Sequence, residues 1–256
     1  MRIHVALLSI LCTITLHAQE FIPLSVSGFN ADCVYESGET LSEQTAMDKN
    51  GWLLYSKKLK SSGGLATSIT SKNYGIPYNF TSFSSNNTLL LNSNTSAYAK
   101  GTLLLDEPQQ AEILFLLGLS ADGGKDIKVT LTYTDNTTEE VQTINFHDWY
   151  GGKDISAHSG LGRISKNSGG YENRLDFSLF EAMLSVNSSK TIKNITCQAG
   201  DGASSYSSIL AVTAVKGYTF SDEAPLFLIN NSHLDTQWNW DITTTIDEYV
   251  KATLND

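Results

Sequence analysis

The sequence has 256 residues and a formal net charge of −10, and 17% of its residues are charged and 10% aromatic. This length is enough for one large or two small domains, and the composition is typical of a globular, β-rich secreted protein. The acidic balance argues against nucleic acid as a partner, because nucleic acid favours basic surfaces, whereas neutral glycans are compatible with it.

Residues 1–18 have the pattern of a signal peptide. Arg2 supplies the positive end, Val5 to Leu11 the apolar core, and Ala18 the last residue before cleavage. The apolar stretch is too short to cross a bilayer, so we predict no membrane span. Cys12 follows a leucine, where lipid attachment requires a small residue. We therefore expect simple export to the periplasm or to the extracellular space.

Residues 19–218 are predicted to form short strands separated by clusters of Gly, Ser and Asn. Ala111 to Leu119 is almost wholly apolar, which predicts a central strand. Asp126 to Asp135 alternates as a half-buried antiparallel strand does, and Glu140 to Phe146 returns to complete a hairpin. The predicted fold is therefore mainly β, a β-sandwich of jelly-roll type. Further strands are predicted at Phe21–Gly28, Asp32–Glu36, Gly51–Ser56, Thr88–Leu91, Thr102–Leu105, Leu175–Phe180, Thr191–Cys197 and Ser207–Val215.

The stretch Asp148-Trp-Tyr-Gly-Gly152 predicts a turn that carries two aromatic side chains, Trp149 and Tyr150. Exposed rings beside polar groups, here Asp148 and Arg163, hold sugar rings in many binding modules by stacking and hydrogen bonding. Both aromatic residues are therefore candidate sugar contacts. The alternative is that Trp149 closes the end of the sandwich and Tyr150 covers it. We favour this packing role, because large aromatic residues at sheet corners usually pack.

The same region resembles the galactose-binding-like sandwiches that precede the catalytic domains of bacterial glycoside hydrolases. The resemblance rests on the strand pattern and on the corner at 148–152 that leads into Gly160-Leu-Gly-Arg-Ile164. It implies a galactose-binding-like β-sandwich as the fold, and a fold does not by itself give a function.

Cys33 and Cys197 are the cysteines that remain after residue 18. In an oxidising compartment the two thiols could pair. Two buried free thiols are an equal alternative, because a domain of this size has enough core without a disulfide. The sequence leaves both alternatives open.

Two acidic stretches that contain glycine make calcium a candidate ligand of the sandwich. Asp122-Gly-Gly-Lys-Asp126 and Asp201-Gly202 place oxygen ligands beside glycine, as calcium loops do. Neither stretch has the spacing of an EF-hand, and Asp-Gly is a common turn. We favour the turn and keep calcium as the alternative.

A domain boundary is predicted at Tyr218 to Asp222, because the pattern changes after it. Leu226 to Ile229 predicts a strand buried on both faces, of the kind found in α/β folds. His233 and Asp235 follow at its carboxyl end, where β/α barrels place their chemistry, and residues two apart point to the same side. A histidine nitrogen and a carboxylate oxygen together suit zinc. The alternative is that His233 and Asp235 form a hydrogen-bonded pair without a metal. A helix is predicted to start near Thr244.

The stretch His233-Leu-Asp235-Thr-Gln-Trp238, on an apolar strand and before this helix, resembles the opening of the catalytic domain of glycoside hydrolase family 38. The members of that family are retaining α-mannosidases. The resemblance implies that His233 and Asp235 bind zinc and that Trp238 packs against the sugar. The family's nucleophile, its further histidine ligand and its acid/base carboxylate come from later in the catalytic domain, and no residue here matches them.

The resemblance implies an N-terminal fragment of an exported, zinc-dependent retaining α-mannosidase that acts on mannose-containing glycans. Residues 219–256 would be the start of the catalytic domain, an incomplete β/α unit whose partner is the rest of that domain. A β/α barrel needs roughly 200 residues or more, so we expect no catalysis from this chain alone. The alternatives are a stand-alone secreted carbohydrate-binding sandwich and a purely structural domain.

Overall fold

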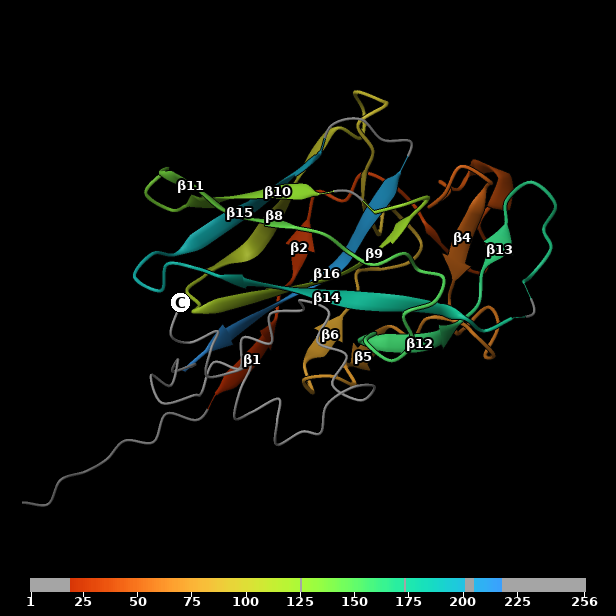
Figure 1. The fold of residues 1–256 in the computed structure, drawn as a ribbon, viewed down its shortest axis with the longest axis horizontal. Coiled ribbons are helices and arrows are strands. Elements are labelled where there is room, and N and C mark those ends of the chain that lie inside the picture. Colours follow the sequence, from red (N-terminus) through yellow and green to blue (C-terminus); the bar gives the residue numbers. More distant parts are fainter. Residues whose placement is uncertain (1–18, 125, 173, 201–204, 218–256) are drawn as a thin grey trace, which may run out of the picture. The chain divides into compact units, whose positions relative to one another are not determined.

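The computed structural model describes residues 19–124, 126–172, 174–200 and 205–217, which form a β-sandwich (Figure 1). The prediction of a mainly β, jelly-roll-type sandwich is confirmed. Within the described ranges there is no helix of the length and apolar character that crossing a membrane requires. The predicted signal peptide and the predicted β/α unit at 219–256 lie outside the described residues.

Two antiparallel sheets make up the sandwich. The six-stranded sheet has the order β1 (Glu20–Pro23), β16 (Tyr206–Lys216), β9 (Ile113–Ala121), β14 (Phe177–Ser185), β12 (His158–Leu161), with β7 (Leu89–Leu91) also paired to β16. The five-stranded sheet has the order β11 (Thr138–Ile144), β10 (Ile127–Tyr133), β15 (Ile192–Ala199), β8 (Lys100–Gln109), β2 (Val26–Ser27).

Strand β9 lies at the centre of the molecule, as its apolar run predicted. Every residue of β9 is buried. Its alternate side chains enter two different hydrophobic clusters, because successive residues of a strand point to opposite faces. Leu114 and Leu116 pack against the five-stranded sheet, together with residues such as Val129 and Ile195. Phe115 and the other odd-numbered residues pack on the opposite face.

A third layer covers that opposite face and is built largely from residues 29–90. Its buried side chains, including Leu54, Leu65 and Tyr78, share one cluster with Phe115. Its elements are β3 (Val34–Tyr35), η1 (Leu41–Glu43), β4 (Trp52–Tyr55), β5 (Ser68–Thr70), β6 (Pro77–Asn79) and, from later in the chain, β13 (Ile164–Ser165). This layer explains why the six-stranded sheet is apolar on both faces.

The predicted hairpin is formed by β10 and β11, which pair antiparallel. Strand β10 alternates buried and less buried residues, from Ile127 to Tyr133, as its sequence predicted. Asn136 occupies the turn with a φ of 63°, a left-handed conformation that asparagine tolerates better than most residues. The segment Tyr74 to Tyr78 is a loop only in part, because β6 begins at Pro77. Proline is accepted there as the first residue of a strand.

Cys33 and Cys197 are both buried free thiols, so the second of the two alternatives holds. Cys33 belongs to the cluster beneath the third layer, whereas Cys197 lies between the two sheets of the sandwich. Burial raises the pKa of Cys197 to about 12 and raises that of Cys33 further. Both side chains therefore act as small apolar core residues.

Candidate functional site

A shallow pocket of about 190 Å³ lies where the edge strand β12 meets the start of β14. Its position follows from the chain corner at 148–152, which leaves the sandwich and returns to it along β12. The bridge between Tyr150 and Phe177 holds this corner against the start of β14. The lining residues are Tyr150, Gly151, Lys153, Ser159, Gly160, Leu175, Asp176 and Ser178.

Two glycines leave the pocket open. Gly160 has a φ of 82° and lies at the irregularity where the pairing of β12 with β14 shifts between Ser159 and Leu161. Gly151 has a φ of 89°. A Cβ atom added at either glycine would have no heavy atom within 4 Å, so it would project into open space. Glycine is favoured at positive φ, and here it also keeps side chains out of the pocket mouth.

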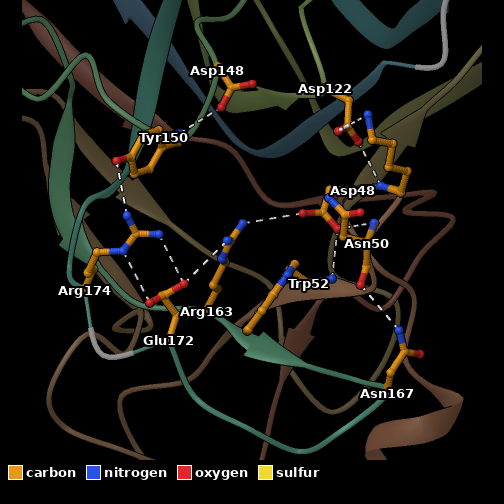
Figure 2. A network of polar contacts seen from close by, with 11 residues as sticks. Asp48, Asn50, Trp52, Asp122, Asp148, Tyr150, Arg163, Asn167, Glu172 and Arg174 are labelled. Carbon is orange, nitrogen blue, oxygen red and sulfur yellow. Dashed lines mark hydrogen bonds and ion pairs between the residues drawn. The ribbon is translucent and has the colours of Figure 1, made fainter.

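Tyr150 supplies an exposed aromatic ring at the pocket, with 53% of its surface accessible. Its backbone N–H donates to a carboxylate oxygen of Asp148 over 2.9 Å, and its hydroxyl accepts from Arg174 over 3.3 Å (Figure 2). The ring centre lies 6.0 Å from that of Phe177. The Asp148 contact thus holds the backbone of Tyr150, and the contacts with Arg174 and Phe177 hold its ring, which remains open to solvent.

The hydroxyl of Ser178 is the least expected feature of the pocket. Ser178 is 1% exposed, and its Oγ atom has no hydrogen-bond partner in the structure. Buried polar atoms are nearly always paired, so an unpaired hydroxyl in the lining of a pocket indicates a position for a ligand or a water molecule. Ser159 nearby is different, because its Oγ accepts a hydrogen bond from the Lys72 ammonium group over 2.9 Å.

Trp149 is 2% exposed, and its ring centre lies 5.1 Å from that of Phe177. Trp149 therefore packs inside the sandwich and is not among the residues that line the pocket. Tyr150 does not simply cover Trp149, because more than half of its surface is open. Of the two candidate sugar contacts, only Tyr150 is exposed and lines the pocket.

Arg163 does not line the pocket and instead packs against the ring of Phe177. Its guanidinium is 3.5 Å from the carboxylate of Asp48 and 3.6 Å from that of Glu172. Glu172 also binds Arg174, so a chain of charges runs from the buried Asp48 to the ring of Tyr150 (Figure 2). The hydrogen bonds from Arg174 lower the pKa of Glu172, whereas burial raises the pKa of Asp48. This chain positions Tyr150 through Arg174.

The residues predicted to bind zinc or calcium lie partly outside the described ranges. His233, Asp235 and Trp238 lie outside the described residues, so the zinc site and its sugar contact stay predictions. Asp122 is described, and its carboxylate accepts from the backbone N–H of Lys49 and lies 3.3 Å from the Lys49 ammonium group (Figure 2). Among the residues that the structure describes, no three His, Cys, Asp or Glu side chains lie close enough to hold a metal ion. Calcium also stays a prediction, since Asp201 is not among them.

Sequence reasoning did not find Lys153, Gly160, Leu175 or Ser178 as site residues. Leu175 was predicted to begin a strand, but β14 begins at Phe177, and Leu175 is 40% exposed on the pocket wall. The glycines around β12 are the one signal that could have located the pocket, because Gly160 interrupts an otherwise plausible strand.

No protein-family model matches the sequence, and no curated protein matches it. Some solved structures resemble it weakly. A carbohydrate-binding module of family 29 is 10% identical, with a TM-score of 0.33 over 78% of this chain and 90% of the module. A variant of such a module in complex with mannohexaose is 14% identical, with a TM-score of 0.32 over 58% of this chain and 89% of that one.

For another variant of such a module the TM-score is 0.27, and the alignment spans 61% of its length and 45% of this chain. Sequence identities and TM-scores this low do not identify the ligand of this chain, which has to be inferred from the chain's own residues.

Proposed function

We propose that the sandwich binds carbohydrate in the pocket beside Tyr150. The observation that carries this proposal is the exposed ring of Tyr150 next to the buried, unpartnered hydroxyl of Ser178. A sugar ring has an apolar C–H face that packs on an aromatic ring and hydroxyls that need hydrogen-bond partners. Tyr150 offers the first kind of contact and Ser178 the second.

The charged groups at the pocket fit the same ligand. Lys153 and Asp176 line it and are both exposed, so each can hydrogen bond to a hydroxyl without a large loss of hydration. One group donates and the other accepts, which suits hydroxyls, since these do both. The volume of about 190 Å³ is below the roughly 300 Å³ at which pockets for drug-sized ligands begin. The pocket therefore suits one sugar ring.

Binding is supported better than hydrolysis. Retaining and inverting glycosidases generally need two carboxyl groups on either side of the scissile bond. Asp176 is the one carboxylate in the lining of this pocket. We therefore propose a carbohydrate-binding sandwich, and we propose no reaction at this site.

The identity of the sugar rests on the sequence. The resemblance of residues 226–256 to the start of an α-mannosidase catalytic domain makes mannose-containing glycans the first ligands to test. In that wider proposal the sandwich accompanies an exported, zinc-dependent enzyme, with His233 and Asp235 as zinc ligands. Binding by the sandwich does not depend on that enzyme and can be tested by itself.

The test is isothermal titration calorimetry of the full chain with manno-oligosaccharides and cello-oligosaccharides. We expect saturable binding that Tyr150→Ala weakens at least tenfold, which is about 1.4 kcal/mol. Leu104→Ala is the matched control, because Leu104 is 45% exposed but lies on β8, outside the pocket lining. Equal binding by wild type and Tyr150→Ala would remove the pocket from the proposal, and no saturable binding by any saccharide would end it.

Ser178→Ala separates a ligand contact from a structural role. Since Oγ of Ser178 has no partner, its removal should leave the midpoint of thermal unfolding unchanged or slightly raised. The same variant should bind saccharide more weakly than wild type. A variant with unchanged affinity would show that the ligand does not reach Ser178.

A further inference from the structure

Several exposed apolar side chains lie in the pocket lining or in segments that contact it. Besides Tyr150 and Leu175 these include Ile155, which is 53% exposed, Met183, which is 48% exposed, and Tyr74, which is 66% exposed. Of the large hydrophobic side chains exposed in the described part of the chain, Leu104 alone lies elsewhere, on β8. Grouped exposure of this kind marks interaction surfaces, whereas isolated exposed apolar residues need no explanation.

The loop between β5 and β6 joins Tyr74 to the pocket wall. The ammonium group of Lys72 donates to Oγ of Ser159 over 2.9 Å and to the carbonyl of Lys153 over 3.0 Å, and both of these residues line the pocket. The side-chain amide of Asn73 donates to the carbonyl of Ile155 over 3.0 Å. Figure 1 shows the β5–β6 pair beside β12, in agreement with these contacts.

Tyr74 is held in place by its own loop. The backbone N–H groups of Tyr74 and Ile76 both donate to Oγ of Ser71, and the backbone N–H of Ser71 donates to the carbonyl of Ile76 over 2.8 Å. Gly75 completes the turn with a φ of 67°. The ring of Tyr74 lies 5.9 Å from that of Phe115, which is paired with Met183 on the neighbouring strand. The exposed ring is thus part of an ordered surface.

Strand β14 gives the spacing between the two tyrosines. Tyr150 is paired with Phe177 at one end of β14, and Tyr74 packs at the level of Met183 near the other end. Six residues of strand at about 3.3 Å each correspond to about 20 Å. One sugar ring cannot touch both tyrosines, but a chain of several rings can.

We propose that the binding face continues from the pocket to Tyr74, so that the ligand is a linear oligosaccharide of several sugar residues. This inference rests on the proposed function of the pocket. Between the two tyrosines the surface carries Lys72, Asn73 and Lys153, which suit the hydroxyls of a sugar chain better than the continuous apolar centre of a protein interface. The ring of Tyr74 then forms a second stacking position, with Met183 beside it.

Chain length is the variable that tests this inference. Calorimetry of the full chain with manno- and cello-oligosaccharides from dimer to hexamer should show affinity that rises with length. Tyr74→Ala should lower the affinity for the hexamer at least fivefold and leave that for the dimer unchanged. Met183→Gln, which leaves the turn around Tyr74 intact, should act in the same direction. Tyr150→Ala should weaken the binding of both the dimer and the hexamer, and Leu104→Ala should weaken the binding of neither.

The outcomes separate the two proposals. If dimer and hexamer bind wild type equally, or if Tyr74→Ala binds the hexamer as wild type does, the extension is wrong and the pocket stands. If no saccharide of any length binds, the proposed function fails and the extension fails with it.

Discussion

The guanidinium carbon of Arg163 lies 4.4 Å from the centre of the Trp52 ring. It lies equally close, at 4.4 Å, to the ring of Phe177 on the opposite element β14. The side chain of Arg163 is only 16% exposed, and that of its partner Asp48 only 4%. A cation held between aromatic rings and beside a buried carboxylate ties β4, β14 and the loop that carries Asp48 together next to Phe177, whose neighbours Asp176 and Ser178 line the pocket.

Arg163→Ala should therefore destabilise the fold. The substitution leaves the carboxylate of Asp48 buried without its cation, and breaking a buried ion pair by removing one partner typically costs about 3 kcal/mol or more. We expect a loss of about 3 kcal/mol in the free energy of unfolding, measured by chemical denaturation followed by tryptophan fluorescence. Arg174→Ala is the control, since Arg174 is 55% exposed and should cost less than about 1 kcal/mol. Similar losses for both variants would contradict the assignment of Arg163 as the buried partner.

The sequence was sufficient for the strands that carry a strong local pattern. The apolar run of β9 and the alternation of β10 were recognised because each reflects its own burial. Strands β5, β6, β12 and β13 were not predicted, since each has at most four residues and includes serine, glycine or proline. Their pairing depends on distant segments, as with Ile164 and Leu53, and such pairing leaves no periodic signal in the chain.

The candidate site was predictable in one residue only. Tyr150 stood out because an aromatic residue before two glycines predicts a turn, but the same argument applied to Trp149, which the structure buries. Both rings pack against Phe177, but only Trp149 also belongs to the buried cluster beneath the third layer, whose other members are remote in sequence. Ser178 carries no sequence signal, because an unpartnered hydroxyl is a property of its surroundings. Asp148 does contact Tyr150, as the sequence suggested. Arg163 was expected to be a polar neighbour of exposed rings, but its side chain is largely buried and pairs with Asp48.

Asn87→Ala should destabilise the third layer. Asn87 is 2% exposed, and its side-chain oxygen accepts from the backbone N–H groups of Cys33 and Val34 over 3.0 and 3.1 Å. Its amide donates to the carboxylate of Asp32 over 2.6 Å. Removal leaves two buried N–H groups without an acceptor, so we expect a loss of about 3 kcal/mol by chemical denaturation. Asn86→Ala, one residue earlier and exposed, should change stability by less than about 0.5 kcal/mol. Equal effects at 86 and 87 would refute the role of the side chain.

Cys33 and Cys197 should react with iodoacetamide only when the protein is unfolded. Both thiols are buried and free, and the high pKa of each keeps it protonated at neutral pH. We expect peptides containing either residue to be unlabelled after treatment of the folded chain and fully labelled in denaturant without a reductant. Labelling that requires prior reduction would reveal a disulfide and contradict the structure.

Asp32 should make the fold more stable as the pH falls towards 5. Burial, followed by the nearby carboxylate of Glu39, raises its pKa to about 6, whereas an unfolded aspartate titrates near 4. Between these values the folded chain holds a proton that the unfolded chain releases. The free energy of unfolding therefore decreases as the pH rises through this window, and the loss is complete above about pH 6. Burial also raises the pKa of Asp48 and Glu181, which act in the same direction.

Asp32→Asn removes the titrating group and keeps an oxygen that can accept from Asn87. Its midpoint of thermal unfolding should rise less than that of wild type when the pH is lowered from 7 to 5, because the contribution of Asp32 is missing while those of the other titrating groups are unchanged. Asp135→Asn is the control, since the hydrogen bonds from Thr137 lower the pKa of Asp135 and move its contribution below this window. If wild type and Asp32→Asn gain equally on acidification, the proton on Asp32 is not linked to folding. A gain that Asp135→Asn reduces instead would place the linkage at the turn of the β10–β11 hairpin and not in the third layer.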